Sequence, residues 1–349
     1  MSDKTDAAPS GSASPQTKND VAVVIVTYKT AALTVDCLRS VAAERAQQPE
    51  LTVRAVVVDN ASGDSATIAA AIAANQWSSW VTLVTAPKNG GFAYGNNVGI
   101  ERAYADRIPD YIFLLNPDTQ VRAGALKELV DFLEAHLNVG IAGSSFENLD
   151  GSDWPVAFRF PSLLSEIESG LNFAPATKLL ARWQVARTMT AVDQPVDWIC
   201  GASMMIRRAV IDTIGGLDEN FFLYYEETDF CRRSLEAGFE TWYVPESRVM
   251  HIMGQSTKVT GVKPGRKRLP AYWFDSRRRY FLLSFGLAKA SIIDIVAILA
   301  CSLGMLKRRV LRRAYQGVPH YVSDLARSSI IWRRNRNVPP ARCAIPRRS

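Results

Sequence analysis

Histidine and cysteine are scarce and scattered in this chain of 349 residues. The three histidines, His136, His251 and His320, are too few and too far apart in sequence to predict a zinc site. The five cysteines form no CxxC pair and no regular framework, and four of them lie in apolar or helical surroundings. We therefore expect reduced thiols, as in cytosolic proteins, and no disulfide scaffold.

A secretory signal and an internal repeat are also lacking. Residues 1–19 are rich in Ser, Ala, Asp, Lys and Pro and contain no apolar run, so we expect a disordered leader. Hydrophobic residues make up 48% of the chain and charged residues 21%. This is ordinary globular composition, with enough length for a sizeable core and one or two domains.

Acidic residues are nearly missing from the last part of the chain. Residues 258–349 contain 21 Lys and Arg against three acids, a net charge of +18, whereas residues 1–257 carry a net charge of −11. An acidic body with a basic tail predicts an anionic partner for the tail, either phospholipid or nucleic acid. The tail contains no recognised nucleic-acid-reading motif, so nucleic acid ranks last and we expect none as a partner.

The tail also contains the longest apolar segment of the chain. Residues 291–306 are almost wholly apolar, interrupted by Asp294, and basic clusters lie at 277–279 and 307–309. About twenty apolar residues are needed to cross a bilayer, and a charge within a span is costly. We therefore expect residues 280–306 to form a helix in the membrane interface, held by basic residues against anionic lipid. A true span and a core-packed helix are the alternatives.

Strand and helix patterns alternate in the first part of the chain. Apolar runs at 21–27, 53–58, 81–85 and 112–115 predict buried strands, and helical stretches follow them at 31–46, 66–74, up to 107 and at 123–136. This order predicts an α/β fold with a mostly parallel sheet flanked by helices. The later patterns predict a strand at 139–146, a helical stretch near 176–186, an apolar stretch at 196–206, a carboxylate-rich helix within 217–238, and short strands at 241–244 and 248–252.

The turn that follows the fourth apolar run reads Asn116-Pro117-Asp118. Pro117 cannot donate a hydrogen bond to a sheet, so the strand ends there. In an open α/β sheet, ligands lie just beyond the carboxyl ends of the strands. A carboxylate at Asp118 suits a hard divalent cation that shares oxygen ligands with substrate phosphates. The alternative is that Asp118 caps the next helix.

Polar or glycine-rich turns follow each of the first four strands. The carboxyl ends of parallel strands meet at one edge of the sheet, so we expect Asp59, Asn60, the loop starting at Asn89 and Asp118 to line one crevice. The glycines of that loop, Gly90 and Gly91, allow close approach of the backbone to a ligand. The loop is either a phosphate-binding loop or an ordinary tight turn.

The carboxylate-rich segment reads FFLYYEETDFCRR from residue 221 to residue 233. On a helix, Glu226 and Asp229 share a face and Arg233 lies one turn beyond Asp229. The four aromatic residues before the acids indicate a partly apolar pocket, which raises a carboxyl pKa towards the range of a general base. The alternative is a solvated helix N-terminus, where acids complement the helix dipole.

Five of these motifs occur together in a recognisable order: VVIVTY at 23–28, VVDNAS at 57–62, NGGFAYGNN at 89–97, LNPD at 115–118 and FLYYEETDFCRR at 222–233. Across about residues 21–256, the chain resembles the family 2 inverting glycosyltransferases, particularly the bacterial rhamnosyltransferase-like branch. The resemblance implies a GT-A fold over residues 20–257, with a nucleotide-sugar-binding half at 20–137 and an acceptor and catalytic half at 138–257. The basic, apolar region 258–349 is then a membrane-associating tail with interfacial helices.

The resemblance also implies roles for individual residues. Thr27, Tyr28 and Asp59 would meet the nucleoside, and Asp118 stands where the family places the metal-binding aspartate of its DxD motif. Further candidates for the nucleotide sugar are Asn60, Asn89, Gly90, Gly91, Asn97 and Asn116. His251 resembles a family histidine near the metal and diphosphate, although by itself it reads as a satisfied histidine at a strand end.

The base of the family corresponds to Glu227, with Glu226 as the less favoured choice. Two departures from the family pattern stand out: Asn116 occupies the place of the first Asp of DxD, and Glu227 replaces the usual Asp. Other candidate site residues are Trp198, Gly201, Asp229 and Arg233.

The implied function is inverting transfer of a sugar, with rhamnose suggested by the resemblance, from a nucleotide-diphosphate sugar. The acceptor would be a glycan or a lipid-linked acceptor in cell-envelope polysaccharide synthesis, and the cofactor Mg²⁺ or Mn²⁺. The expected location is the cytoplasmic face of the inner membrane, as a peripheral or monotopic protein on an anionic surface. The alternative is a non-catalytic nucleotide-sugar-binding or scaffold protein at the membrane, which the two departures make plausible.

Overall fold

The computed structural model describes residues 19–147, 153–251, 267–312, 317–332 and 345. The expected leader therefore lies outside the described residues except for its last position. The expected membrane-associating region is described only in part.

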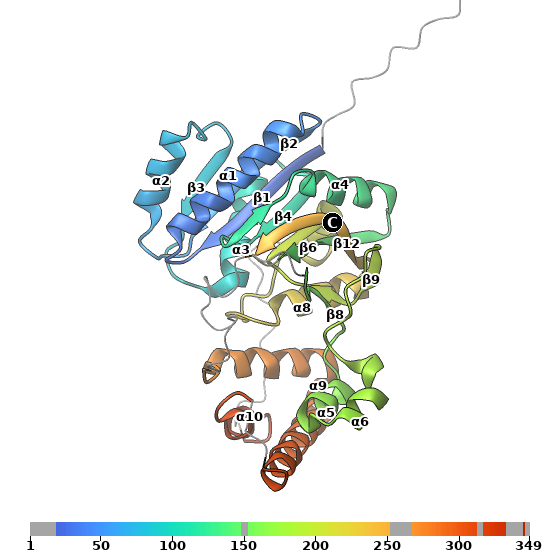
Figure 1. The fold of residues 1–349 in the computed structure, drawn as a ribbon. Coiled ribbons are helices and arrows are strands. Elements are labelled where there is room, and N and C mark those ends of the chain that lie inside the picture. Colours follow the sequence, from blue (N-terminus) through green and yellow to red (C-terminus); the bar gives the residue numbers. More distant parts are fainter. Residues whose placement is uncertain (1–18, 148–152, 252–266, 313–316, 333–344, 346–349) are drawn as a thin grey trace, which may run out of the picture.

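Four parallel strands form the first half of one ten-stranded sheet (Figure 1). In spatial order they are β3 (Val81–Thr85), β2 (Leu51–Asp59), β1 (Asn19–Thr27) and β4 (Tyr111–Leu115). The connecting helices are α1 (Ala31–Gln47), α2 (Ser65–Ala74) and α3 (Gly91–Asp106). All five residues of β4 are buried, as a continuous apolar run predicts for a strand covered on both faces. The predicted mostly parallel α/β sheet flanked by helices is confirmed.

The second half of the sheet is mixed. Strand β11 (Ser203–Arg207) pairs antiparallel with both β4 and β6 (Val139–Glu147), and β12 (Glu240–His251) runs parallel to β6. The short strand β5 (Thr119–Val121) pairs antiparallel with the end of β12, so Thr119 and His251 are register partners. Strands β7 (Asp153–Trp154) and β9 (Gln194–Val196) extend this half, and α4 (Ala125–Ala135) packs against it. One sheet thus runs through both predicted halves.

Three segments differ from the sequence prediction. The apolar stretch 196–206 contains β10 (Trp198–Ile199), paired with β8 (Ala157–Phe158), then a turn at Gly201 and then β11. The two short strands expected at 241–244 and 248–252 are one strand, β12, whose register shifts around Pro245, a residue without a ladder donor. The region near 176–186 holds α6 (Ala174–Leu179) and a short 3-10 turn (Ala181–Trp183), preceded by α5 (Leu163–Leu171).

Along the chain, helices α7 (Arg208–Ile214) and α8 (Glu226–Glu236) come between β11 and β12. Helices α9 (Ala271–Val310) and α10 (Tyr321–Ser328) form a layer with α5 below the sheet (Figure 1). Helix α9 is broken at Gly286, where φ is +71° and ψ is 173°. Its first half lies beneath α8, and its second half packs against α5 and α10. In the described part of the chain, α9 is the one helix that by length and composition is apolar enough to cross a membrane.

Two arginines that the sequence assigns to the lipid surface are buried inside the protein. Arg277 is 2% exposed and pairs with Asp294 at 2.6 Å and with Glu166 at 2.7 Å. Arg279 pairs with the fully buried Asp218. The prediction that the cluster 277–279 contacts anionic lipid is therefore wrong for these two residues, because Glu166 and Asp218 of the body and Asp294 of α9 itself pair with them.

Candidate active site

Two adjoining pockets lie at the carboxyl edge of the parallel strands. The asparagine pocket has a volume of about 390 Å³, and its lining includes Tyr28, Asn60, Asn89, Gly91, Phe222 and Tyr272. The carboxylate pocket has a volume of about 410 Å³, and its lining includes Asp118, Trp198, Gly201, Glu226, Glu227 and His251. Phe92, Asn116 and Leu223 line both pockets, so the two form one continuous site. Of the residues expected to line one crevice at the strand ends, Asn60, Asn89 and Asp118 line these pockets and Asp59 does not.

The asparagine pocket is built from the turns after β1, β2 and β3. The side-chain amide of Asn60 donates to Asn89 Oδ1 at 3.1 Å and to the Gly91 carbonyl at 3.0 Å. Its oxygen accepts from the Gly90 N–H at 3.3 Å. These bonds tie the end of β2 to the glycine loop and fix the shape of the pocket floor. Tyr28, 41% exposed, presents its ring to the opening.

Gly91 is required by a close contact with the aromatic loop 221–225. It has φ +86°, and a Cβ built on it would lie 1.9 Å from the Phe222 carbonyl oxygen. The neighbouring Phe92 N–H donates to that carbonyl at 2.8 Å. The glycine loop is therefore more than an ordinary turn, because its backbone holds the loop that leads to Glu226 and Glu227.

Asp118 and His251 meet at the far end of the carboxylate pocket. Asp118 is 2% exposed, and its Oδ1 lies 3.4 Å from His251 Nε2. The pairing of β5 with β12 explains this approach, since Thr119 is the register partner of His251. Residues 133 positions apart in sequence are thereby brought to one point at the strand ends.

The two glutamates enter the same pocket from a strained turn. Tyr224 and Tyr225 both have φ +70°, in the left-handed region that bulky residues seldom adopt. Helix α8 begins immediately afterwards, so that Glu226 and Glu227 form its first turn. In each glutamate, Oε2 is buried and makes no hydrogen bond to any described residue. Such atoms require a partner, and a substrate hydroxyl can provide one.

Burial raises the pKa of both glutamates. The pKa of Glu227 rises to about 7 because its carboxylate is desolvated. Burial, and then the charge of Glu227, raise the pKa of Glu226 well above its ordinary range. Near neutral pH, Glu226 therefore retains its proton while Glu227 exchanges one, which is the behaviour of a general base.

An aromatic wall closes one side of the carboxylate pocket. The rings of Phe158 and Trp198 stack with their centroids 4.2 Å apart, and Trp198 Nε1 donates to the Arg159 carbonyl at 2.9 Å. Gly201 lies against another ring, since a Cβ there would be 3.1 Å from Phe92 and 3.7 Å from Glu227 Cβ. A wall of this kind suits the apolar face of a sugar ring more than a free anion.

Two of the predicted nucleoside contacts lie behind the pockets. Thr27 and Asp59 are fully buried and line neither pocket. The Thr27 hydroxyl lies 2.9 Å from the hydroxyls of Thr30 and Thr34. Burial by itself raises the pKa of Asp59, but hydrogen bonds from Ser62 and Ser65 outweigh it and lower the pKa. Asp59 thus holds the turn after β2 as a carboxylate.

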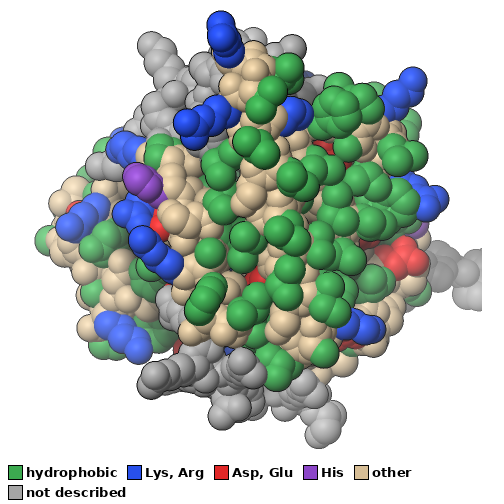
Figure 2. Space-filling model, turned by 90° about the horizontal axis from the view of Figure 1, so that it is seen from below, with side chains coloured by type: hydrophobic (Ala, Val, Ile, Leu, Met, Phe, Trp, Pro, Cys, Tyr) green, Lys and Arg blue, Asp and Glu red, His purple; other side chains and the backbone are tan. Residues whose placement is uncertain are grey.

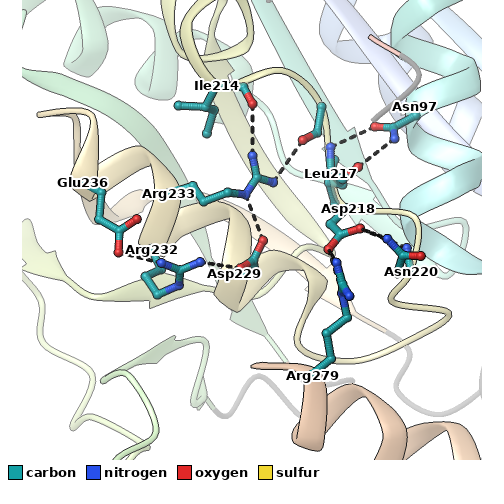
Figure 3. Close-up of polar contacts among 11 residues, drawn as sticks. Asn97, Ile214, Leu217, Asp218, Asn220, Asp229, Arg232, Arg233, Glu236 and Arg279 are labelled. Carbon is teal, nitrogen blue, oxygen red and sulfur yellow. Dashed lines mark hydrogen bonds and ion pairs between the residues drawn. The ribbon is translucent and has the colours of Figure 1, made fainter. Parts of the chain in front are cut away.

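Asn97, Asp229 and Arg233 also lie outside the pockets, where they support the loop between α7 and α8 (Figure 3). The Asn97 amide donates to the Leu217 carbonyl at 2.8 Å and accepts from its N–H at 2.9 Å. Arg233 donates to Asp229 at 2.8 Å and to the carbonyls of Ile214 and Gly216. These side chains hold the framework around the site and line neither of its two pockets.

Asp118 and His251 can supply part of a divalent-cation site. In the part of the chain that the structure describes, no group of three or more His, Cys, Asp or Glu side chains could hold a metal alone. Two side-chain ligands fit Mg²⁺ or Mn²⁺ when phosphate oxygens and waters complete the shell. Asn116 adds an amide in the same pocket, a weaker ligand than a carboxylate.

Phe158 and Tyr272 line the pockets but are missing from the sequence prediction. Phe158 belongs to an irregular segment with no periodic pattern. The signal for Tyr272 is the aromatic start of the basic tail, which the sequence reading assigns to membrane contact. Its place beside the glycine loop depends on how α9 folds back, and no local pattern encodes that.

Comparison with known proteins places these features in a family. Residues 17–267 match the model described as "Glycosyltransferase like family 2". An N-acetylglucosaminyl-diphospho-decaprenol L-rhamnosyltransferase of Mycobacterium tuberculosis is 30% identical over 155 residues, which is 43% of this chain and 49% of that protein. Rhamnosyltransferase WbbL of Escherichia coli is 28% identical over 166 residues, 46% of this chain and 60% of that protein. The chain thus spans about half the length of the curated relatives it matches.

Solved structures agree on the fold. A mannosyltransferase from Pyrobaculum calidifontis, solved with GDP-Man and Mn²⁺, superposes with a TM-score of 0.50 at 15% identity, over 89% of this chain and 79% of that one. GalNAc-T7, solved with UDP, GalNAc and Mn²⁺, gives a TM-score of 0.52 at 14% identity, over 88% and 57%. The likeness shows the GT-A fold. With the family model matching most of its length, the chain belongs to glycosyltransferase family 2.

Proposed function

We propose that this chain transfers a sugar from a nucleotide-diphosphate sugar to an acceptor hydroxyl, with inversion at the anomeric carbon. One observation carries the proposal. Glu227, whose pKa is raised to about 7 by burial, shares a 410 Å³ pocket with Asp118 and His251. A base, and ligands for a cation that would neutralise the leaving diphosphate, are the two parts that a direct displacement needs.

Glu227 acts as the general base in this mechanism. Its carboxylate takes the proton of the acceptor hydroxyl as the oxygen attacks the anomeric carbon, and the bond to the nucleoside diphosphate breaks on the opposite side. Glu226, with the higher pKa, stays protonated and is available to donate a hydrogen bond to the substrate. No protein nucleophile takes part, so the configuration inverts in a single step.

The diphosphate lies, in our proposal, where the two pockets join, beside Asn116. Asp118 and His251 would hold Mg²⁺ or Mn²⁺, which neutralises charge on the leaving diphosphate when bound. The asparagine pocket would take the nucleoside and the carboxylate pocket the transferred sugar and acceptor. We assign Tyr28, Asn60, Asn89, Gly90 and Gly91 to the donor side.

The substrates are proposed from the relatives' names. Three of the relatives are named as rhamnosyltransferases or dTDP-rhamnosyl transferases, one of them acting on a decaprenol-linked sugar. We propose dTDP-rhamnose as the donor and a glycan or lipid-linked glycan of the cell envelope as the acceptor. The aromatic wall of Phe158 and Trp198 would stack on the acceptor sugar.

We also propose that the second half of α9 docks on an anionic membrane surface at the cytoplasmic face of the inner membrane. Its outer face carries an apolar stripe at spacings of three and four residues, each member 45% exposed or more: Ile292, Ile295, Leu299, Leu303, Leu306 and Val310. Figure 2 shows hydrophobic side chains gathered on this end of the molecule with Lys and Arg around them. The opposite face of the helix is buried, so the helix would lie in the interface and not cross the bilayer.

Donor hydrolysis tests the enzymatic proposal. Purified protein is incubated with dTDP-rhamnose, GDP-mannose or UDP-N-acetylglucosamine, with Mn²⁺ or with EDTA, and released nucleoside diphosphate is measured. We expect Mn²⁺-dependent release from one donor, and Asp118→Asn to lower it at least 100-fold. Asp131→Asn on the exposed surface of α4 is the matched control and should change nothing. Absence of release from every donor, with or without lipid-linked acceptor, would contradict the proposal.

Vesicle flotation tests the membrane proposal. The chain should float with phosphatidylglycerol-containing vesicles, and the double variant Leu299→Glu, Leu303→Glu should not. Leu137→Glu changes a leucine that is even more exposed, at 76%, and lies away from α9, and this variant should float like the original chain. Flotation of the double variant would exclude the stripe as the docking face.

A further inference from the structure

The first half of α9 is part of the active site, although it lies outside the segment that matches the family. The family model ends at residue 267, and α9 starts at Ala271. In Figure 1 this half runs directly below α8. One of its side chains, Tyr272, lines the asparagine pocket together with Tyr28, Asn60 and Asn89.

Tyr272 belongs to an aromatic cluster at the pocket, together with Phe222 and Tyr224. Its ring centroid lies 5.2 Å from that of Phe222 and 6.3 Å from that of Tyr224, with the Tyr224 ring inclined by 20°. The side chain is partly buried, so part of the ring remains open to the pocket. Burial raises the pKa of its hydroxyl, which therefore stays a neutral hydrogen-bond donor at physiological pH.

Three side chains of α9 fix the helix half that carries this ring. Ser276 Oγ donates to the Leu223 carbonyl at 3.0 Å, in the loop that lines both pockets. One turn further, Arg279 reaches from α9 to Asp218, as Figure 3 shows. Arg277 pairs with Asp294 and Glu166. The ring is thus held in place before any ligand arrives, which lowers the entropy lost on binding.

The lining of the asparagine pocket points to the ligand's chemistry. Its described lining residues are aromatic, aliphatic, glycine, proline or asparagine, and none of them is charged. The acids and His251 are confined to the neighbouring pocket. A neutral pocket with ring faces and amides suits a nucleobase, which stacks on aromatic side chains and hydrogen-bonds to amides. It suits a diphosphate poorly.

We propose that Tyr272 binds the nucleoside part of the donor by stacking, as a binding residue supplied from outside the family-matched segment. The proposal rests on the proposed function, because it takes the ligand to be a nucleotide-diphosphate sugar. It adds that the family-matched segment by itself lacks one wall of the donor pocket.

Titration calorimetry of the full chain with UDP, dTDP and GDP in the presence of Mn²⁺ tests the proposal. For the nucleotide that binds best, Tyr272→Leu should raise Kd about 10-fold, the loss of one base–aromatic stack. Tyr272→Phe retains the ring and should change Kd by less than about twofold. The matched control is Phe274→Leu, the same loss of a ring on the same half of α9. Phe274 packs with Leu325 in a cluster away from the pockets.

The outcomes separate this proposal from the proposed function. If none of the nucleotides binds the original chain, the proposed function fails and this inference with it. If the original chain binds and Tyr272→Leu binds equally well, Tyr272 has no part in donor binding and only this inference fails. Equal weakening by Tyr272→Leu and Phe274→Leu would show that looser packing of α9, and not a lost stack, weakens binding, and would also overturn it.

Discussion

Replacing Glu227 by glutamine should abolish transfer and at the same time stabilise the protein at alkaline pH. Burial raises the pKa of Glu227 from 4.5 to about 7, so the folded state binds this proton more tightly than the unfolded chain does. The resulting stabilisation is complete below pH 4.5 and is lost as the pH rises through about 7. A shift from 4.5 to about 7 corresponds to about 3 kcal/mol at most.

The Glu227→Gln variant has no proton to lose at this position. From pH 5 to pH 8, the free energy of unfolding of the variant should therefore fall by up to about 3 kcal/mol less than that of the original chain. Transfer should drop at least 100-fold, because the acceptor hydroxyl loses its base. In the original chain the rate should rise with pH through about 7 and then level off, as the carboxylate form of Glu227 becomes populated.

Urea unfolding at pH 5 and pH 8, together with a transfer assay, measures both effects. Glu236→Gln is the control on the same helix, since the Glu236 side chain is 62% exposed and its removal should leave both quantities nearly unchanged. Retained transfer in Glu227→Gln would refute its role as base. An unchanged pH dependence of stability would refute the burial argument from which that role is derived.

Three further changes follow from particular contacts. Gly91→Ala places a Cβ against the Phe222 carbonyl and should lower both the melting temperature and the transfer rate, whereas an unaffected rate would show that the loop 221–225 can move without consequence. Asp294→Ala leaves Arg277 buried without its nearest partner and should cost about 3–5 kcal/mol in urea unfolding; a change below about 1 kcal/mol would mean that Glu166 alone satisfies Arg277. Trp198→Leu should raise the acceptor KM several-fold and leave the donor KM unchanged, and steady-state kinetics with each substrate varied in turn decides between this and a donor-side role.

The parallel half of the fold is predictable because its strands are short, continuous apolar runs that end in clear turn signals. Asn116-Pro117-Asp118 ends β4 where the local chemistry demands it. The antiparallel β11 is not predictable in the same way, since an apolar run does not encode its direction. Helix α5 could have been predicted, because Ser162 and Ser165 form a capping box at its start, and Leu163, Ile167 and Leu171 recur at intervals of four residues.

The site is predictable where a motif sits directly at a strand end, as Asn60 and Asp118 do. It is less predictable where a motif also contains residues with a structural role. Asn97 and Asp229 lie within the motifs at 89–97 and 222–233, but their side chains hold neighbouring segments of the chain by hydrogen bonds. The long-range ion pairs of Arg277 and Arg279 have partners up to 111 residues away, so charge counting alone assigned both to the surface.

The unbroken pairing from β4 through β11 to β6 has a mechanical consequence. The strands that lead to the two pockets belong to one hydrogen-bonded sheet, which is unbroken from β4 through β11 to β6. In the proposed mechanism, substrate binding would therefore not close the site by moving one half of this sheet against the other. In the proposed mechanism, the distance from the diphosphate to the base Glu227 is set when the chain folds. Any adjustment during a reaction cycle would come from the loops at the edge of the sheet.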